Sequence, residues 1–228
     1  MERLVILSGA GISAESGIKT FRDADGLWEG HDVMEVASPE GWFKNQELVL
    51  DFYNQRRRQL KEVRPNAAHL GFVELEKNYD VQIITQNVDD LHERAGSQSV
   101  LHLHGELRKV RSTRFPELIY DWEDDLFLGS NCEKGFQLRP HIVWFGEAVP
   151  MIEPAVRIVE SADIVVVIGT SMQVYPAASL IGFAPHDSRK FYIDPKPSIN
   201  HELSLSQNLE VIEATATQGI QHLLSSLL

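Results

Sequence analysis

The run IVVVIG, residues 164–169, is apolar at every position up to its final glycine. A strand with one buried face alternates apolar and polar side chains, whereas a strand covered on both faces is apolar throughout. The run therefore predicts a central strand of a parallel sheet that has helices on both of its faces.

Other short apolar runs end in small or polar residues, at 4–7, 81–84, 100–103, 142–145 and 191–193. Helix-like segments lie between many of them, for example residues 66–77 and 152–161. This alternation predicts an α/β fold with a doubly wound, mostly parallel, Rossmann-like sheet. Ligands of such folds bind at the carboxyl ends of the strands.

Two stretches interrupt the alternation, and we expect them to form one smaller domain from residues 28–65 and 108–139. The Rossmann-like domain then consists of residues 1–27, 66–107 and 140–228. The first insertion is predicted to be helical.

Composition excludes several classes of function. The 228 residues carry a formal net charge of −12, which disfavours a nucleic-acid partner because binding to phosphates needs a surplus of Lys and Arg. The single cysteine, Cys132, cannot form an internal disulfide, which fits a reducing compartment. Neither a membrane span nor a signal peptide is visible. We therefore expect a cytoplasmic protein without membrane or nucleic-acid partners; the oligomeric state stays open, with a monomer as the expectation.

A glycine-rich loop, GAGISAESGIKTFR at residues 9–22, follows the first predicted strand. Gly9 and Gly11 allow a tight turn, and Ser13 could cap a helix whose amides face a diphosphate. The third glycine comes late, at Gly17, so a plain glycine-rich turn is the alternative.

Polar residues also follow three other predicted strands. After residues 81–84 come Gln86, Asn87 and Asp89; after 164–168 come Gly169, Thr170 and Ser171; after 100–103 comes His104. Together these loops favour nucleotide binding, with His104 as a candidate general base. The alternatives are helix capping by Asn87 or Asp89 and a structural role for His104. His102 is expected to pack or to form hydrogen bonds in the core.

The helix predicted over residues 46–63 carries an arginine within its apolar stripe. Tyr53 and Arg56 lie on the apolar face, Arg57 on its flank and Arg58 opposite. A buried arginine needs an anionic partner. Tyr53 and Arg56 could together hold a ligand carboxylate, and an internal salt bridge of Arg56 is the alternative.

Five segments in order, GAGISAESGIKTFR, TQNVDDLHERAG, LHG, PHIVWFGE and GTS, resemble the sirtuin family of NAD-dependent protein deacylases. The resemblance runs from Leu4 to the C-terminus. It is strongest to class III, bacterial-type sirtuins, whose alanine, tyrosine and arginine for negatively charged acyl groups match Ala37, Tyr53 and Arg56. It implies removal of succinyl, malonyl and possibly acetyl groups from protein lysines, giving nicotinamide and O-acyl-ADP-ribose. An NAD glycohydrolase or mono-ADP-ribosyltransferase with the same pocket and a non-catalytic NAD sensor are the alternatives.

The resemblance also implies residue roles. His104 and Asn87 would be catalytic. NAD would contact Gly9, Ala10, Gly11, Ser13, Ile18, Phe21, Arg22, Trp28, Gln86, Asn87, Asp89, Gly169, Thr170, Ser171, Asp194 and Ala216. The acyl-lysine would contact Ala37, Tyr53, Arg56, Val143, Trp144 and Phe145, with the backbone of Val143 holding its amide. Lys19 and Asp194 depart from the proline and asparagine common in the family.

Sirtuins usually carry a structural zinc, held by two pairs of cysteines, in the segment that corresponds to residues 111–140. Only Cys132 remains here, and such a site needs four ligands, so the sequence predicts no zinc. We expect an apolar cluster packed against the sheet domain to replace it, formed by Phe115, Leu118, Ile119, Trp122, Leu126, Phe127, Leu128 and Phe136.

Overall fold

The computed structural model describes residues 1–19, 27–28 and 30–228. Six strands form a parallel sheet in the order β11-β10-β9-β1-β4-β5. They are β1 (Arg3–Ser8), β4 (Asp80–Thr85), β5 (Val100–His102), β9 (Ile164–Ile168), β10 (Arg189–Ile193) and β11 (Leu209–Ile212). The order reverses between β1 and β9, which confirms the doubly wound α/β fold and places a ligand-binding crevice there. Sequence patterning missed β11.

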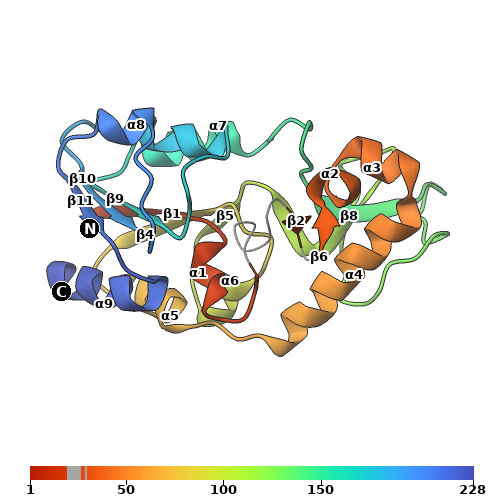
Figure 1. Ribbon diagram of the computed structural model, residues 1–228, viewed down its shortest axis with the longest axis horizontal. Coiled ribbons are helices and arrows are strands. Elements are labelled where there is room, and N and C mark those ends of the chain that lie inside the picture. The colour runs from red at the N-terminus through yellow and green to blue at the C-terminus, as the bar shows by residue number, and fades with distance from the viewer. Residues whose placement is uncertain (20–26, 29) are drawn as a thin grey trace.

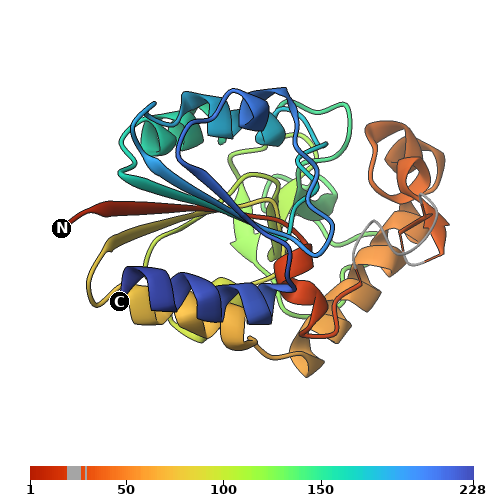
Figure 2. The same cartoon turned by 60° about the vertical axis from the view of Figure 1, so that its left-hand side comes forward.

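Helices cover both faces of the parallel sheet (Figures 1 and 2). One face carries α1 (Gly11–Ala14), α5 (Ala67–Leu75) and α9 (Ala216–Leu227); the other carries α7 (Ile152–Val159), the 3₁₀ helix η2 (Ala177–Phe183) and α8 (His201–Ser204). Strand β1 is buried on both sides, because Leu4 and Ile6 belong to the first core and Val5 and Leu7 to the second. No helix among the described residues is long and apolar enough to cross a membrane.

The prediction of a strand over residues 142–145 was wrong. Strand β8 (Leu138–Ile142) ends at Ile142 and belongs to a separate antiparallel sheet, β7-β6-β8, with β6 (Gly105–Ser112) and β7 (Ile119–Asp121). Beyond it, Val143 N donates to His104 O (2.8 Å) and Phe145 N to Ala37 O (2.9 Å). The run is apolar because Trp144 is buried in another core, not because it forms a strand.

A third hydrophobic core joins residues from both insertions. The first insertion supplies β3 (His31–Asp32), α2 (Val33–Val36), α3 (Pro39–Lys44) and the long α4 (Gln46–Glu62), and β3 pairs with β2 (Leu27–Trp28). Phe52 and Leu60 of α4 share this core with Val110 and Leu126 of the second insertion. Leu91 and Trp144, which lie outside both insertions, also belong to it, so the exact domain boundaries stay a prediction. In Figure 1 this small module lies beside the parallel sheet.

The expected apolar cluster in residues 111–140 is only partly present. Leu126 is fully buried, and Leu118 and Trp122 pack at the margin of the core. The other members are largely exposed, namely Ile119, Phe127, Leu128 and Phe136, apart from Phe115, whose ring lies 5.4 Å from that of Phe136. The buried members join the core of the small module rather than the parallel sheet, because α4 lies directly against this segment.

Candidate active site

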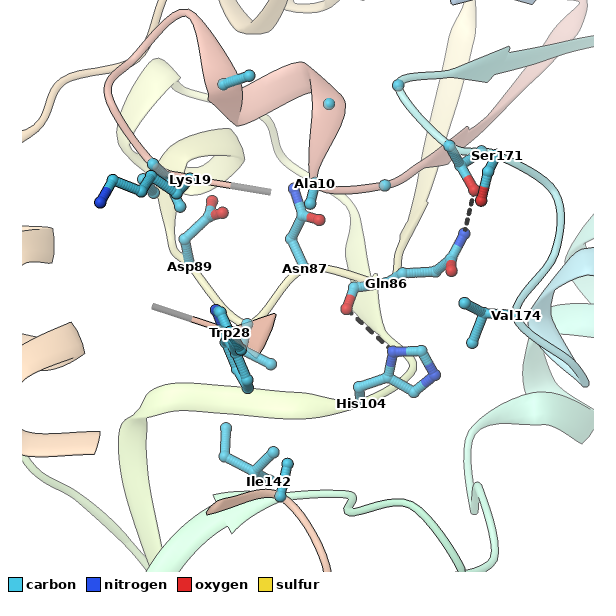
Figure 3. A pocket seen from close by; sticks show the side chains of 18 of the residues that line it. Ala10, Lys19, Trp28, Gln86, Asn87, Asp89, His104, Ile142, Ser171 and Val174 are labelled. Carbon is cyan, nitrogen blue, oxygen red and sulfur yellow. Dashed lines mark hydrogen bonds between the residues drawn. The ribbon is translucent and has the colours of Figure 1, made fainter. Parts of the chain in front are cut away.

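A pocket of about 610 Å³ lies where the carboxyl ends of β1, β4 and β9 face the small module. It gathers all the described site residues predicted from the sequence except Ser13, which is buried just behind it. Phe21 and Arg22 lie outside the described residues. Figure 3 shows part of the lining, with Ala10 and Lys19 near one end and Ile142 near another.

Three loops at this edge are called the first (after β1, from residue 9), the second (residues 86–89, after β4) and the third (residues 169–171, after β9). The first and third loops pack backbone against backbone. Gly9 N donates to Ile168 O (3.0 Å) and Gly11 N to Gly169 O (2.8 Å). A Cβ on Gly11 would lie 2.7 Å from the Cα of Gly169, and Gly169 itself has a φ of +62°. Glycine is therefore required at both positions to bring the two loops together at the crevice.

Ser13 does not cap α1, contrary to the sequence-based prediction. The helix is a single turn whose N-cap is Ala10, which makes no side-chain cap. Ser13 lies inside it, donates from Oγ to Asp89 Oδ2 (3.0 Å) and accepts from Asn87 Nδ2 (3.2 Å). The hydroxyl thus fixes an amide and a carboxylate from the second loop, and Figure 3 shows Asn87 and Asp89 pointing towards the first loop.

Asp89 is buried and accepts a second hydrogen bond, from Leu91 N to Oδ1 (3.1 Å), at the start of α6 (Leu91–Ala95). The capping alternative is not realised, because the N-cap of α6 is Asp90, which makes no side-chain cap; Asp89 bonds Leu91 N from one residue before it. Burial raises the pKa of Asp89 to about 6, against the opposing effect of its two hydrogen bonds.

His104 presents one ring nitrogen to the pocket. Its Nδ1 lies 3.0 Å from Gln86 O (dashed in Figure 3). A carbonyl only accepts, so Nδ1 carries the proton and Nε2 keeps its lone pair in the neutral ring. Burial lowers the pKa of His104, and the Gln86 bond partly opposes this shift. Gly105 has a φ of +82°, and a Cβ there would lie 2.0 Å from His141 O, so β8 can approach only a glycine.

His102 lies outside the pocket lining, behind the second loop. Its Nδ1 is 2.9 Å from Asn87 O and its Nε2 is 2.7 Å from Glu93 Oε1. The prediction of a hydrogen-bonded core histidine is confirmed.

The far end of the pocket is lined by the predicted acyl contacts. Trp144 Nε1 donates to Tyr53 Oη (3.0 Å), and the Arg56 guanidinium carbon lies 4.4 Å from the centroid of the Phe52 ring. Ala37 is tied to Phe145 through the backbone. The N–H of Val143 donates to His104 O.

Arg57 was placed wrongly on the flank of α4: it is 1% exposed and is the buried arginine of that helix. Its Nε donates to Leu107 O (3.1 Å), and its Nη1 to Asn54 Oδ1 (2.8 Å) and Asp124 O (3.2 Å). Burial lowers its pKa to about 10, opposed by Asp125 and Asp124. Arg58 is exposed and pairs with Asp125, as expected for the opposite face.

Comparison with known proteins places the chain in a family. A model described as "Sir2 family" matches residues 9–176. The chain belongs to the Sir2 family. An NAD-dependent protein deacylase of Helicobacter pylori (strain ATCC 700392 / 26695) is 62% identical over 228 residues, covering 100% of this chain and 98% of that protein. One of Bacteroides thetaiotaomicron is 52% identical, covering 98% of this chain and 97% of that protein.

Solved structures of Sir2 homologues have the same fold. The crystal structure of a Sir2 homologue–NAD complex aligns with a TM-score of 0.88 at 40% identity, over 99% of this chain and 89% of that one. A mutant Sir2 homologue in complex with ADP-ribose also gives 0.88, at 39% identity, over 99% and 91%.

The Sir2 pocket also contains residues that sequence reasoning missed. They are Ala14, Glu15, Gln59, Leu60, Val88, Leu107, Ile142, Gly146, Glu147, Val149, Val174, Tyr175, Pro176, Pro195, Lys196 and Thr215. Most are neighbours of predicted residues, so extending each motif by one or two positions would have found them. Glu147 was quoted within the PHIVWFGE segment but was given no role.

The predicted lack of a zinc site stays a prediction. Cys132 is a free, buried thiol whose Sγ lies 3.4 Å from Ser112 Oγ. Within residues 1–19, 27–28 and 30–228, no group of three or more His, Cys, Asp or Glu side chains could hold a metal.

Proposed function

We propose that the chain is an NAD-dependent protein-lysine deacylase that prefers acyl groups ending in a carboxylate, such as succinyl and malonyl, over acetyl. One observation carries the proposal: a single pocket holds a buried amide and carboxylate, a histidine with an available lone pair, and a tyrosine–arginine pair at its far end. Relatives that are 50–62% identical and bear the name NAD-dependent protein deacylase support the reaction class.

The pocket residues fit NAD. The glycines of the first and third loops form a cradle at the β1–β9 switch point, where a Cβ would collide with backbone and where dinucleotides bind in this fold class. Asn87 and Asp89 offer a donor and an acceptor side by side, which matches a carboxamide. Gly169, Thr170, Ser171, Asp194 and Ala216 line the same pocket and would contact the adenosine half.

NAD supplies the ribose carbon that receives the acyl oxygen as nicotinamide leaves. Ser13 orients Asn87 and Asp89, which would hold the nicotinamide carboxamide. His104 accepts a proton at Nε2, while its Nδ1–H stays bonded to Gln86 O, so the ring is held in one tautomer and orientation. The apolar walls formed by Ile142, Val143 and Trp144 exclude water from the acyl-lysine.

The acyl preference rests on Tyr53 and Arg56. A guanidinium and a hydroxyl on one helix face can hold a carboxylate through several charge-assisted hydrogen bonds. An acetyl group ends in a methyl group and gains nothing from either side chain.

The test compares succinyl- and acetyl-lysine peptides with NAD in the wild type and in Arg56→Met, which keeps the volume and removes the charge. We expect kcat/KM for the succinyl peptide to fall about 30-fold or more, as for a lost charged hydrogen bond, and acetyl turnover to change little. Arg58→Met is the matched control, because Arg58 lies two residues further along, on the exposed face of α4. Equal losses on both peptides would refute the carboxylate contact.

The inferred partners are acylated lysines of other proteins. We infer that the enzyme acts in the cytoplasm, whose reducing conditions fit its single unpaired cysteine, and that it is a monomer. Sedimentation of the purified protein tests the oligomeric state.

A further inference from the structure

Two arginines face each other across the small antiparallel sheet. Arg111 of β6 and Arg139 of β8 are paired in register. Like charges in this position repel, unless an anion lies between them. The carboxylate of Glu147 does so: Arg139 donates to its two oxygens at 2.7 and 3.1 Å, and Arg111 at 3.3 and 3.2 Å.

Arg139 is also in contact with Trp144 of the pocket wall. Its guanidinium carbon lies 3.2 Å from the centroid of the indole ring, and its Nη2 donates to Ile142 O (3.0 Å). Glu147 Oε2 accepts from Trp144 N (2.8 Å). The ion pair therefore holds the backbone of Trp144 from one side and the face of its ring from another.

The contact continues from Trp144 to Tyr53. An indole N–H can only donate, so the hydroxyl oxygen of Tyr53 is the acceptor of the 3.0 Å bond. The proton of Tyr53 is then left to donate to a ligand in the pocket that Tyr53 lines. Burial raises the pKa of Tyr53 above its ordinary value, which keeps that proton in place at neutral pH.

We propose that Arg139 is a positioning residue for acyl recognition: paired with Glu147, it fixes Trp144, which in turn orients the Tyr53 hydroxyl as a donor to the acyl carboxylate. The inference rests on the proposed deacylase function. Arg139 lies outside the described lining of the pocket, so its effect on substrate choice is indirect.

A double-mutant cycle tests this, with Arg139→Lys and Tyr53→Phe alone and together. Lysine keeps the charge but lacks the planar fork that pairs with Glu147 and stacks on Trp144. We expect Arg139→Lys to lower the succinyl-to-acetyl ratio of kcat/KM about fivefold, the loss of one hydrogen bond, and to have no further effect in the Tyr53→Phe background. Trp144→Phe, which removes the indole N–H together with part of the ring, should also lower the succinyl-to-acetyl ratio.

The control is Arg157→Lys, in an exposed ion pair with Glu153 on α7, which should leave the ratio unchanged. Equal losses on both peptides would show that Arg139 only supports the fold. An undiminished effect of Arg139→Lys in the Tyr53→Phe background would also overturn the proposal, because it would show that Arg139 does not act through Tyr53.

A second measurement does not depend on turnover. The indole N–H signal of Trp144 in a ¹H–¹⁵N spectrum is assigned by its loss in Trp144→Phe. We expect Arg139→Lys and Tyr53→Phe each to shift this signal, and Arg157→Lys to leave it in place. An unmoved signal in Arg139→Lys overturns the positioning role, whereas wild-type protein inactive on both peptides overturns the proposed deacylase function instead.

Discussion

Asp89 lowers the stability of the fold at neutral pH. Its carboxyl is buried beside Ser13, and burial raises its pKa to about 6 from its ordinary value of 3.8. Between these two values the folded protein binds a proton that the unfolded chain releases, so the free energy of unfolding falls as the pH rises. Above pH 6 Asp89 is ionised, and the free energy of unfolding is lowered by the full amount. Polar groups placed for ligand binding commonly cost stability in this way.

Asp89→Asn should therefore stabilise the protein at pH 7, by about 1–3 kcal/mol, and much less at pH 4. Asparagine can still accept from Leu91 N and can donate to Ser13 Oγ, so the local hydrogen bonds survive. Urea unfolding at both pH values measures the effect, with the exposed Asp187→Asn as control. An equal gain at pH 4 and pH 7 would contradict it, and we expect deacylation to fall.

Individual site residues could be predicted when a strand end placed them. Asn87, His104 and Thr170 each follow an apolar run, and the parallel sheet brings such positions to one edge. The contacts of Ser13 could not be predicted, because a serine behind a glycine turn has the same local signature whether it caps a helix or bonds a carboxylate 76 residues away.

At the scale of elements, polar side chains of α4 bind the backbone of other segments and so hold the small module together. Asn54 accepts from Leu126 N (2.8 Å) and donates to Leu126 O (3.0 Å). Arg57 donates to the carbonyls of Leu107 and Asp124. One turn of a helix thus satisfies backbone groups of two other segments of the small module.

Neighbouring arginines on α4 should differ sharply in their contribution. Arg57→Met removes three hydrogen bonds, two of them buried, and takes a donor from two carbonyls, so it should lower the free energy of unfolding by about 3 kcal/mol. Arg58→Met breaks an exposed ion pair and should have little effect. Chemical denaturation of both variants compares them, and equal losses would refute the assigned role of Arg57.

The helical period predicted α4 but not this role. An apolar stripe identifies the face towards a hydrophobic core, whereas α4 also buries Asn54 and Arg57 against backbone. Their partners depend on where residues 107 and 124–126 lie, which only the tertiary structure fixes. For the same reason, the exposed side chains of Phe127 and Leu128 were wrongly expected to be buried.

In the whole molecule, two buried histidines join the parallel sheet to its helices. His92 of α6 lies 3.0 Å from Ser8 Oγ at the end of β1, and its ring centroid is 5.0 Å from that of His69 in α5. Burial lowers the pKa of His69 to about 4 and that of His92 well below its ordinary value. Both are therefore neutral in the folded protein at pH 6.

Acid should destabilise the protein through these histidines. Between pH 6.5 and 4 the unfolded chain binds protons that folded His69 does not, so stability is complete above pH 6.5 and falls by about 3 kcal/mol towards pH 4 for this residue alone. Asp89 acts in the opposite direction over part of that range. We expect His69→Gln, which does not titrate, to flatten the curve of unfolding free energy against pH; a curve with unchanged slope would contradict the assignment.

The order of strands and helices in the main domain could be largely predicted. Strand β9 begins and ends with its apolar run, and α5 begins directly after its N-cap, Asn66. The small antiparallel sheet could not. Its strand β8 reads LRPHI, with polar residues and a proline, and is defined by pairing with β6 rather than by its own pattern.

The contact between Glu15 and Thr217 has a consequence for synthesis. Glu15 Oε2 accepts from Thr217 N (2.9 Å) and Oε1 from Thr217 Oγ1 (2.6 Å), across 202 residues of chain, and Ala216 completes the wall of the pocket. The ribosome therefore makes the glycine loop 202 residues before its support at Thr217. A nascent chain that has not reached residue 216 contains all five motif segments but lacks this wall of the pocket, so we expect cofactor binding to begin only after this point.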